Sequence, residues 1–82
     1  MPQYDGSYTR QAGAGATYAY RITYAMHDHL LHWSAIVDIG GHEKGRPYGT
    51  FEFPQLPGDD QQRQKAEDFT RAAIEALRDV NE

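Results

Sequence analysis

The chain has 82 residues, with eight Lys or Arg against twelve Asp or Glu, a formal net charge of −4 and no Cys. This composition excludes disulfides and thiolate metal sites, and the negative charge disfavours a polyanion as the main partner. The N-terminus has no signal-peptide core and no apolar stretch reaches the roughly 20 residues that span a bilayer, so we expect a cytoplasmic protein without membrane contact.

The first 15 residues are rich in Gly, Ser, Thr and Gln, and their only large apolar side chains are those of Tyr4 and Tyr8. Ordering a segment costs about 1 to 2 kcal/mol of backbone entropy per residue, which two tyrosines do not offset. We therefore expect a flexible N-terminal arm over residues 1–15, followed by a single small domain over residues 16–82.

Three segments beyond the arm alternate apolar and polar residues, which is typical of strands with one buried face. They cover residues 17–26, 31–39 and 48–53. Polar residues at 27–29 form a turn between the first two segments, and Pro54 ends the third because proline has no amide hydrogen for a ladder. The sequence thus predicts three antiparallel strands.

The apolar period becomes helical after Pro57, and Asp59 or Asp60 is expected to cap the helix. The helix is expected to run to about Val80, with Glu67 on the side that faces water. The opposite, apolar side is formed by Ala66, Phe69, Ala73, Ala76, Leu77 and Val80. The predicted fold is therefore α+β, a three-stranded antiparallel sheet packed on one C-terminal helix in the order β-β-β-α.

One helix covers one face of such a sheet, so the second face stays open and is the best candidate for function. Strand parity places mainly small and polar residues there: Ala19, Arg21, Thr23, Leu30, His32, Ser34, Ile36, Asp38, Tyr48, Thr50 and Glu52.

Four large side chains are the candidate protein contacts: Tyr18, Tyr20, Ile36 and Tyr48. The two tyrosines at the start of the first strand lie either beyond the reach of the helix or in the ends of a small core. Small domains often complete their cores by association. We therefore expect a non-enzymatic interaction or accessory domain that binds a protein partner or a second copy of itself, through the open face or a strand edge.

Nucleic-acid binding is the alternative function. Its candidate contacts are the basic residues Arg21, Lys44, Arg46, Arg63 and Lys65. The stretch from residue 48 through the helix is similar to the closing strand and helix of double-stranded-RNA-binding domains, which implies phosphate contacts at Arg63 and Lys65. The similarity covers less than half of the chain and does not include the family's first helix. Residues 16–53 contain three basic and four acidic side chains, and this negative balance disfavours a phosphate-binding sheet.

Three histidines, His27, His29 and His32, lie close together in the sequence, and imidazole is a common metal ligand. A solvated hairpin tip explains the same residues because two of them flank the expected turn. The glycine-rich stretch at 40–46 leads into a strand, whereas a phosphate-binding loop leads into a helix. We expect neither a metal site nor a cofactor.

A serine-hydrolase trio can be written with His32, Ser34 and Asp38, which share one strand face. Residues two and four positions apart on a strand are separated by roughly 6.6 and 13 Å, which is too far for a hydrogen-bonded relay. We therefore expect no catalytic residues.

Overall fold

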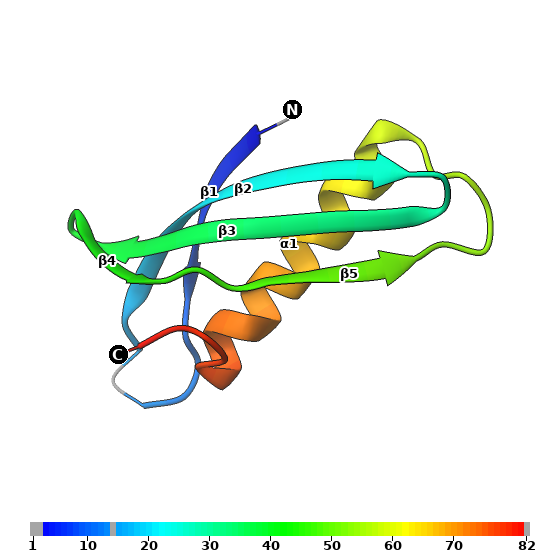
Figure 1. The fold of residues 1–82 in the computed structure, drawn as a ribbon. Coiled ribbons are helices and arrows are strands. Elements are labelled where there is room, and N and C mark those ends of the chain that lie inside the picture. The colour runs from blue at the N-terminus through cyan, green and yellow to red at the C-terminus, as the bar shows by residue number, and fades with distance from the viewer. Residues whose placement is uncertain (1–2, 14, 82) are drawn as a thin grey trace.

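In the described part of the chain, residues 3–13 and 15–81, five antiparallel strands form one sheet and a C-terminal helix packs against it (Figure 1). The computed structural model has the elements β1 (Gln3–Thr9), β2 (Thr17–His27), β3 (Leu30–Ile39), β4 (His42–Gly45), β5 (Tyr48–Glu52) and α1 (Asp59–Ala76). The α+β class with an antiparallel sheet and a C-terminal helix is confirmed, and the expected three strands are corrected to five within these residues. No helix of the described residues is long and apolar enough to cross a membrane.

The β2–β3 hairpin is the centre of the sheet, and its alternating sequence sets its register. Ile22 pairs with Ala35 and Tyr24 pairs with Trp33, so the large apolar residues of both strands share one face. Asp28 in the connecting turn has a φ of 55°, a left-handed conformation that aspartate tolerates better than most residues. The predicted hairpin is therefore present with its turn in the expected place.

Strand β4 was not expected, because residues 42–45 have no apolar side chain that alternation could reveal. A Gly40–Gly41 turn brings this strand back against β3, and both glycines have positive φ, as a two-residue type I′ hairpin requires. β4 and β5 pair with the same edge of β3 at different points along its length. A hydrogen bond of 2.9 Å from the Ala35 N–H to the Pro47 carbonyl spans the gap between them.

Strand β1 corrects the expectation of a flexible arm. It pairs along its whole length with β2, with Gly6 opposite Tyr20. The two tyrosines of β1 are held by the helix as well: the Arg63 guanidinium lies 5.0 Å from the ring centroid of Tyr4, and the Tyr8 hydroxyl donates to Glu75 Oε1 at 2.6 Å. These contacts, together with the ladder to β2, order residues 3–9, while residues 1, 2 and 14 of the expected arm lie outside the described residues.

The loop after β1 contacts the C-terminal end of α1 through Glu75, the residue that also accepts from Tyr8. The backbone amides of Gln11 and Ala12 donate to the Glu75 carboxylate at 2.9 and 3.2 Å. The hydrogen bonds from Gln11 and Tyr8 hold the pKa of Glu75 below its usual value, because they favour the ionised carboxylate.

The helix starts and ends differently from the expectation. Its N-cap is Gly58, not Asp59 or Asp60, and the Gly58 N–H donates to the Gln61 side chain at 3.3 Å. It ends at Ala76, not near Val80, because Leu77 takes a left-handed conformation with φ 52°.

The residues after the helix extend back to the sheet. Val80 forms an isolated bridge with Gly45 and is buried, so it belongs to the core as expected but reaches it from an extended segment. The Asn81 N–H donates to the Lys44 carbonyl at 2.7 Å. A Cβ atom at residue 45 would collide with the backbone of Asp79, so this close approach requires glycine.

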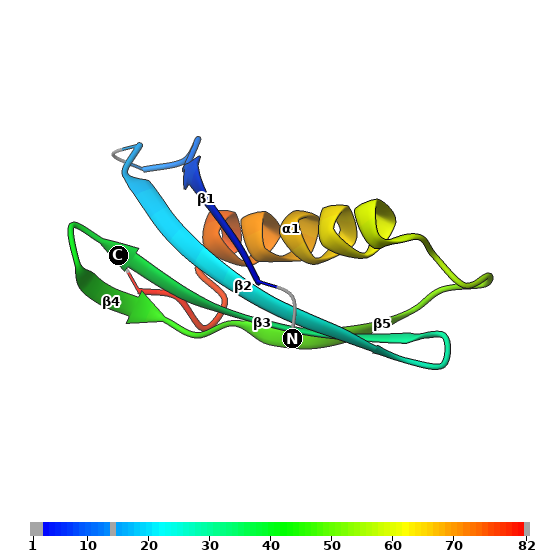
Figure 2. The same cartoon turned by 90° about the horizontal axis from the view of Figure 1, so that it is seen from above.

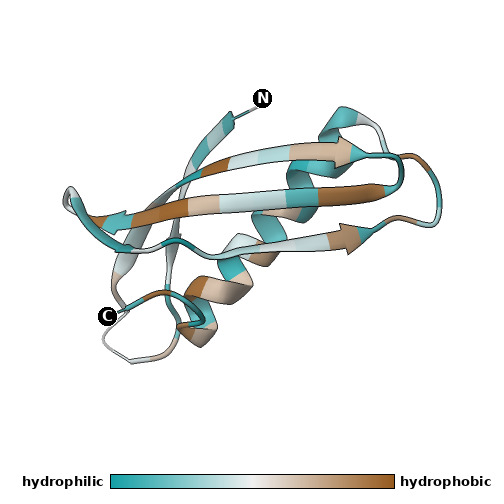
Figure 3. Cartoon of the chain, viewed as in Figure 1, coloured by the Kyte–Doolittle hydropathy of each residue, from teal (hydrophilic) through white to brown (hydrophobic). Residues whose placement is uncertain are grey.

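The core lies between α1 and the inner face of the sheet (Figure 2). Ile22, Leu31 and Val37 are fully buried there, and burial of such a side chain contributes about 1.5 to 3 kcal/mol. Trp33 stacks on Phe69 with 5.9 Å between ring centroids and 3° between planes. Apolar residues are spread along β2 and β3 and recur along α1, as Figure 3 shows.

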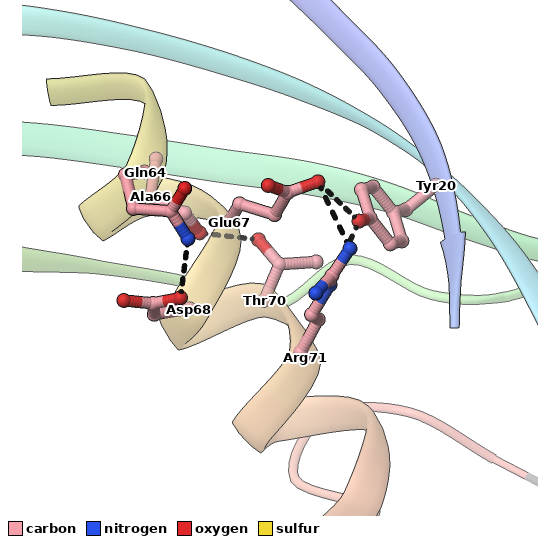
Figure 4. Close-up of polar contacts among 7 residues, drawn as sticks. All are labelled: Tyr20, Gln64, Ala66, Glu67, Asp68, Thr70 and Arg71. Atoms are coloured by element: carbon pink, nitrogen blue, oxygen red, sulfur yellow. Dashed lines mark hydrogen bonds and ion pairs between the residues drawn. The ribbon is translucent and has the colours of Figure 1, made fainter. Parts of the chain in front are cut away.

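Glu67 is a further correction on the helix, since it is buried instead of facing water. Its carboxylate accepts a hydrogen bond of 2.7 Å from the Tyr20 hydroxyl, and Arg71 contacts both groups (Figure 4). The ring of Tyr20 crosses over Gly6, where a Cβ atom would lie 2.8 Å from it. The absent side chain on β1 therefore lets a tyrosine of β2 reach the helix.

Candidate functional site: the open face of the sheet

The face of the sheet opposite α1 carries no other element of the described residues (Figure 2). We call it the open face. Its side chains alternate along each strand with the buried ones and come from β1, β2, β3 and β5: Gln3, Asp5, Ser7, Thr9, Ala19, Arg21, Thr23, Ala25, His27, Leu30, His32, Ser34, Ile36, Asp38, Tyr48, Thr50 and Glu52.

The strand register arranges these residues in rows. Asp5, Arg21 and Ile36 form one row, since each lies opposite the next on the neighbouring strand. Within this row Arg21 Nε donates to Asp5 Oδ1 at 3.1 Å, and both side chains are well exposed. Such an exposed pair adds little stability, but it leaves this row without a net charge.

Two large apolar side chains protrude from the face. Ile36 is 42% exposed and Tyr48 is 74% exposed. Tyr48 lines a depression of about 490 Å³, together with His27, His32 and small residues of the neighbouring strands such as Ala25 and Ser34. The face therefore combines a projecting aromatic ring with an adjacent hollow.

The other two candidate contacts, Tyr18 and Tyr20, are in the core. They are 1% and 3% exposed, and their hydroxyls bond to the Asn81 carbonyl at 3.2 Å and to Glu67 at 2.7 Å. Parity already placed them on the side of Ile22, and β1 and the C-terminal segment cover the end of the core that seemed beyond the helix. They cannot join Ile36 and Tyr48 in a contact surface.

The basic residues of the sheet are paired with acids or lie apart. Arg46 donates two hydrogen bonds to Glu43, at 2.9 and 3.0 Å, and this contact lowers the pKa of the Glu43 carboxyl. Arg21 is paired with Asp5 as described above. Lys44 lies on β4, beside the C-terminal segment.

The basic residues of the helix lie on the opposite side of the molecule from the open face. Arg63 lies over Tyr4 and 3.8 Å from Asp60, and the Lys65 ammonium lies 4.8 Å from the centroid of the Phe51 ring. The structure therefore does not gather the five candidate nucleic-acid contacts on one surface.

The histidines divide into a pair and a separate residue. The rings of His27 and His32 meet edge to face on the open face, with 5.0 Å between centroids. The ring of His29 is directed elsewhere, with Nδ1 3.1 Å from the Phe53 carbonyl. Within residues 3–13 and 15–81, no three His, Cys, Asp or Glu side chains are arranged to hold a metal ion.

His32, Ser34 and Asp38 lie in a line along β3 on the open face, as parity predicts. Among the described residues, no hydrogen bond links any two of them. The three side chains therefore do not form a hydrogen-bonded relay.

The sequence reasoning missed the contribution of β1 to this face, which includes Asp5 and Ser7. The signal was present as the alternation of Tyr4 and Tyr8 with polar residues between Gln3 and Thr9. A flexible arm was expected because the contacts to α1, which offset the entropy cost of ordering this segment, are invisible in the local sequence.

Comparisons with protein-family models, with curated proteins and with solved structures found no match to this chain.

Proposed function

We propose that this chain is a small non-enzymatic interaction domain that binds a protein through the open face of its sheet, around Ile36 and Tyr48. The observation that supports this proposal is that a whole sheet face is bare while the helix covers the other one. Tyrosine is enriched at protein interfaces because its ring is apolar and its hydroxyl remains able to bond.

The size and charge of the face fit this role. The two longest dimensions of the molecule are 39 and 22 Å, so a contact over the face could cover on the order of 800 Å² of one partner, which is the usual size of a specific interface. The charges of Asp5 and Arg21 compensate each other, and small residues such as Ala25 and Ser34 let a partner approach closely. A partner with one projecting apolar group and a polar rim suits this surface.

The same observations disfavour nucleic acid as the partner. Binding to phosphates draws on Lys and Arg that release counterions, and Arg21 and Arg46 are already engaged with Asp5 and Glu43. Titration with duplex RNA and duplex DNA at low salt is therefore expected to leave the amide spectrum of the sheet unchanged.

Photo-crosslinking from the face tests the proposal. In cells that make the protein, Tyr48→p-benzoylphenylalanine is expected to give one discrete protein adduct, and mapping of the crosslinked peptides identifies the contact. Ala72→p-benzoylphenylalanine, which places the same group on the exposed side of α1, is the matched control and is expected to give no such adduct.

A second substitution separates specific contact from chance capture. Ile36→Asp in the same chain replaces the central apolar side chain by a carboxylate and gives the row of Asp5, Arg21 and residue 36 a net negative charge. It is expected to abolish the adduct while the fold is kept. An adduct that is equally strong from position 72, or one that survives Ile36→Asp, would contradict the proposal.

A further inference from the structure

The two edges of the sheet differ in how well they are protected against pairing with another strand. One edge is formed by β4 and β5. β4 is already paired with the C-terminal segment at Lys44 and Gly45. β5 has five residues and lies between Pro47 and Pro54, and proline at a strand end prevents extension of a ladder. β1 has seven residues, ends the strand order and contains neither Pro nor Lys. The β1 edge therefore lacks the usual protection and is available for pairing with another strand.

The outward-facing backbone groups of β1 follow from its pairing with β2. The Arg10 N–H donates to the Ala16 carbonyl at 3.0 Å, and this pair continues the β1–β2 register by one residue. Because hydrogen-bonded and non-hydrogen-bonded pairs alternate in an antiparallel ladder, the polar groups of Tyr8, Gly6 and Tyr4 are directed to β2. The N–H and C=O groups of the intervening residues point away from the sheet: Gln3, Asp5, Ser7 and Thr9.

The sequence of this strand reads with the same pattern in both directions. Gln-Tyr-Asp-Gly-Ser-Tyr-Thr is symmetric about Gly6, with a tyrosine two positions on each side and polar residues between. We propose that β1 pairs antiparallel with β1 of a second copy of this chain, with Gly6 on the two-fold axis. Such an isologous contact needs a surface that complements itself, and a strand with a symmetric pattern provides it.

The register about Gly6 is the one that the charges and the strand length favour. It places Asp5 opposite Ser7 of the second copy and Tyr4 opposite Tyr8 of the second copy, and all seven residues pair. The next register that keeps the outward groups paired is shifted by two residues. In one direction this shift places Asp5 opposite Asp5 of the second copy, where like charges repel. A shift in the other direction places Ser7 opposite itself and leaves Gln3 and Tyr4 beyond the partner strand.

The consequence is one continuous sheet made of two chains. A two-fold axis perpendicular to the sheet puts both open faces on the same side and both α1 helices on the other. The inference goes beyond the proposed function, because it uses the backbone edge of β1 and leaves Ile36 and Tyr48 free for a partner.

Charge substitutions at Ser7 test the inference, since this side chain is exposed and its backbone is not bonded to β2. Sedimentation velocity over about 10 µM to about 1 mM protein is expected to show a monomer–dimer equilibrium. Ser7→Asp places two like-charge pairs in the dimer and should raise its dissociation constant roughly 2- to 30-fold, whereas Ser7→Lys faces Asp5 of the second copy and should lower it by a similar factor.

A proline variant and amide exchange test directly whether the backbone of β1 forms the contact. Ser7→Pro removes an outward N–H and no hydrogen bond to β2, and it is expected to abolish the dimer. Amide exchange at Asp5 and Ser7 in the wild type should slow as the protein concentration rises. A wild-type chain that stays monomeric over this range would overturn the inference. A dimer whose dissociation constant is the same in all three Ser7 variants as in the wild type would also overturn it. Loss of that dimer in Tyr48→Ala would assign the contact to the open face instead.

Discussion

Tyr20 joins the two layers of the protein through a single hydroxyl group. The hydroxyl donates to Glu67 Oε2 at 2.7 Å and accepts from Arg71 Nε at 3.2 Å (Figure 4). Burial and the neighbouring Glu67 raise the pKa of Tyr20 from its usual value near 10 to about 12. The buried glutamate is therefore balanced by one donor from each layer, a tyrosine of the sheet and an arginine of the helix.

The raised pKa of Tyr20 makes stability depend on alkaline pH. The folded state keeps a proton that the unfolded state loses near pH 10, so the contribution is fully present below about pH 10 and is lost as the pH rises through about 12. Urea unfolding at a series of pH values should show this decline, with a shallower slope for Tyr20→Phe. An identical slope for wild type and variant would contradict the assignment.

The same variant should lose stability at neutral pH. Removing the hydroxyl leaves the Glu67 carboxylate without its shortest hydrogen bond, which costs about 1 to 3 kcal/mol for a buried acceptor. Tyr48→Phe is the matched control, because its hydroxyl is exposed and surface changes usually stay within about 0.5 kcal/mol.

At the scale of elements, the contact between the C-terminal segment and β4 depends on Gly45. Gly45→Ala directs a methyl group at the Asp79 carbonyl, and overpacking of this kind costs about 1 to 3 kcal/mol. We expect lower urea stability together with faster amide exchange at Asn81, whose N–H bonds to the Lys44 carbonyl. Thr50→Ala, on the exposed face of β5, should change neither quantity, and an unchanged Asn81 amide in Gly45→Ala would show that this contact is not maintained in solution.

The elements that could be predicted are those whose own sequence carries a period. β2, β3, β5 and α1 each have a regular apolar repeat, and each lies close to its expected place. β4 was missed because its four residues have no such repeat. The Gly40–Gly41 turn before it was a usable signal. The helix end was missed because Leu77 adopts a left-handed conformation that leucine seldom takes.

The candidate site was predicted in part for the same reason. Strand parity is a local property, so it correctly placed Ile36 and Tyr48 on the exposed side of the sheet. Parity also placed Tyr20 on the side of Ile22. The burial of Glu67, however, depends on its contact with Tyr20, 47 positions away, which no local pattern encodes. Tyr18 and Tyr20, for which a core position and a contact position were both open, lie in the core, whereas Glu67 was wrongly expected to face water.

At the scale of the whole molecule, our two proposals place association on two separate surfaces. The open face offers side chains around Tyr48, and the β1 edge offers backbone groups between Gln3 and Thr9. A domain this small buries a limited fraction of its surface, so contacts at either place add to a modest core. Because the two surfaces use different atoms, substitutions at Tyr48 and at Ser7 should act independently.

The central claim is that the chain covers one face of its sheet and leaves the other bare. The isoleucine methyl spectrum of a dilute sample, recorded with a soluble gadolinium chelate, tests it most directly. The signal of Ile36, on the open face, should broaden strongly, while those of Ile22 and Ile74, which are fully buried between the layers, should stay sharp. An Ile36 methyl as well protected as that of Ile22 would contradict the account, because the chain itself would then cover the face.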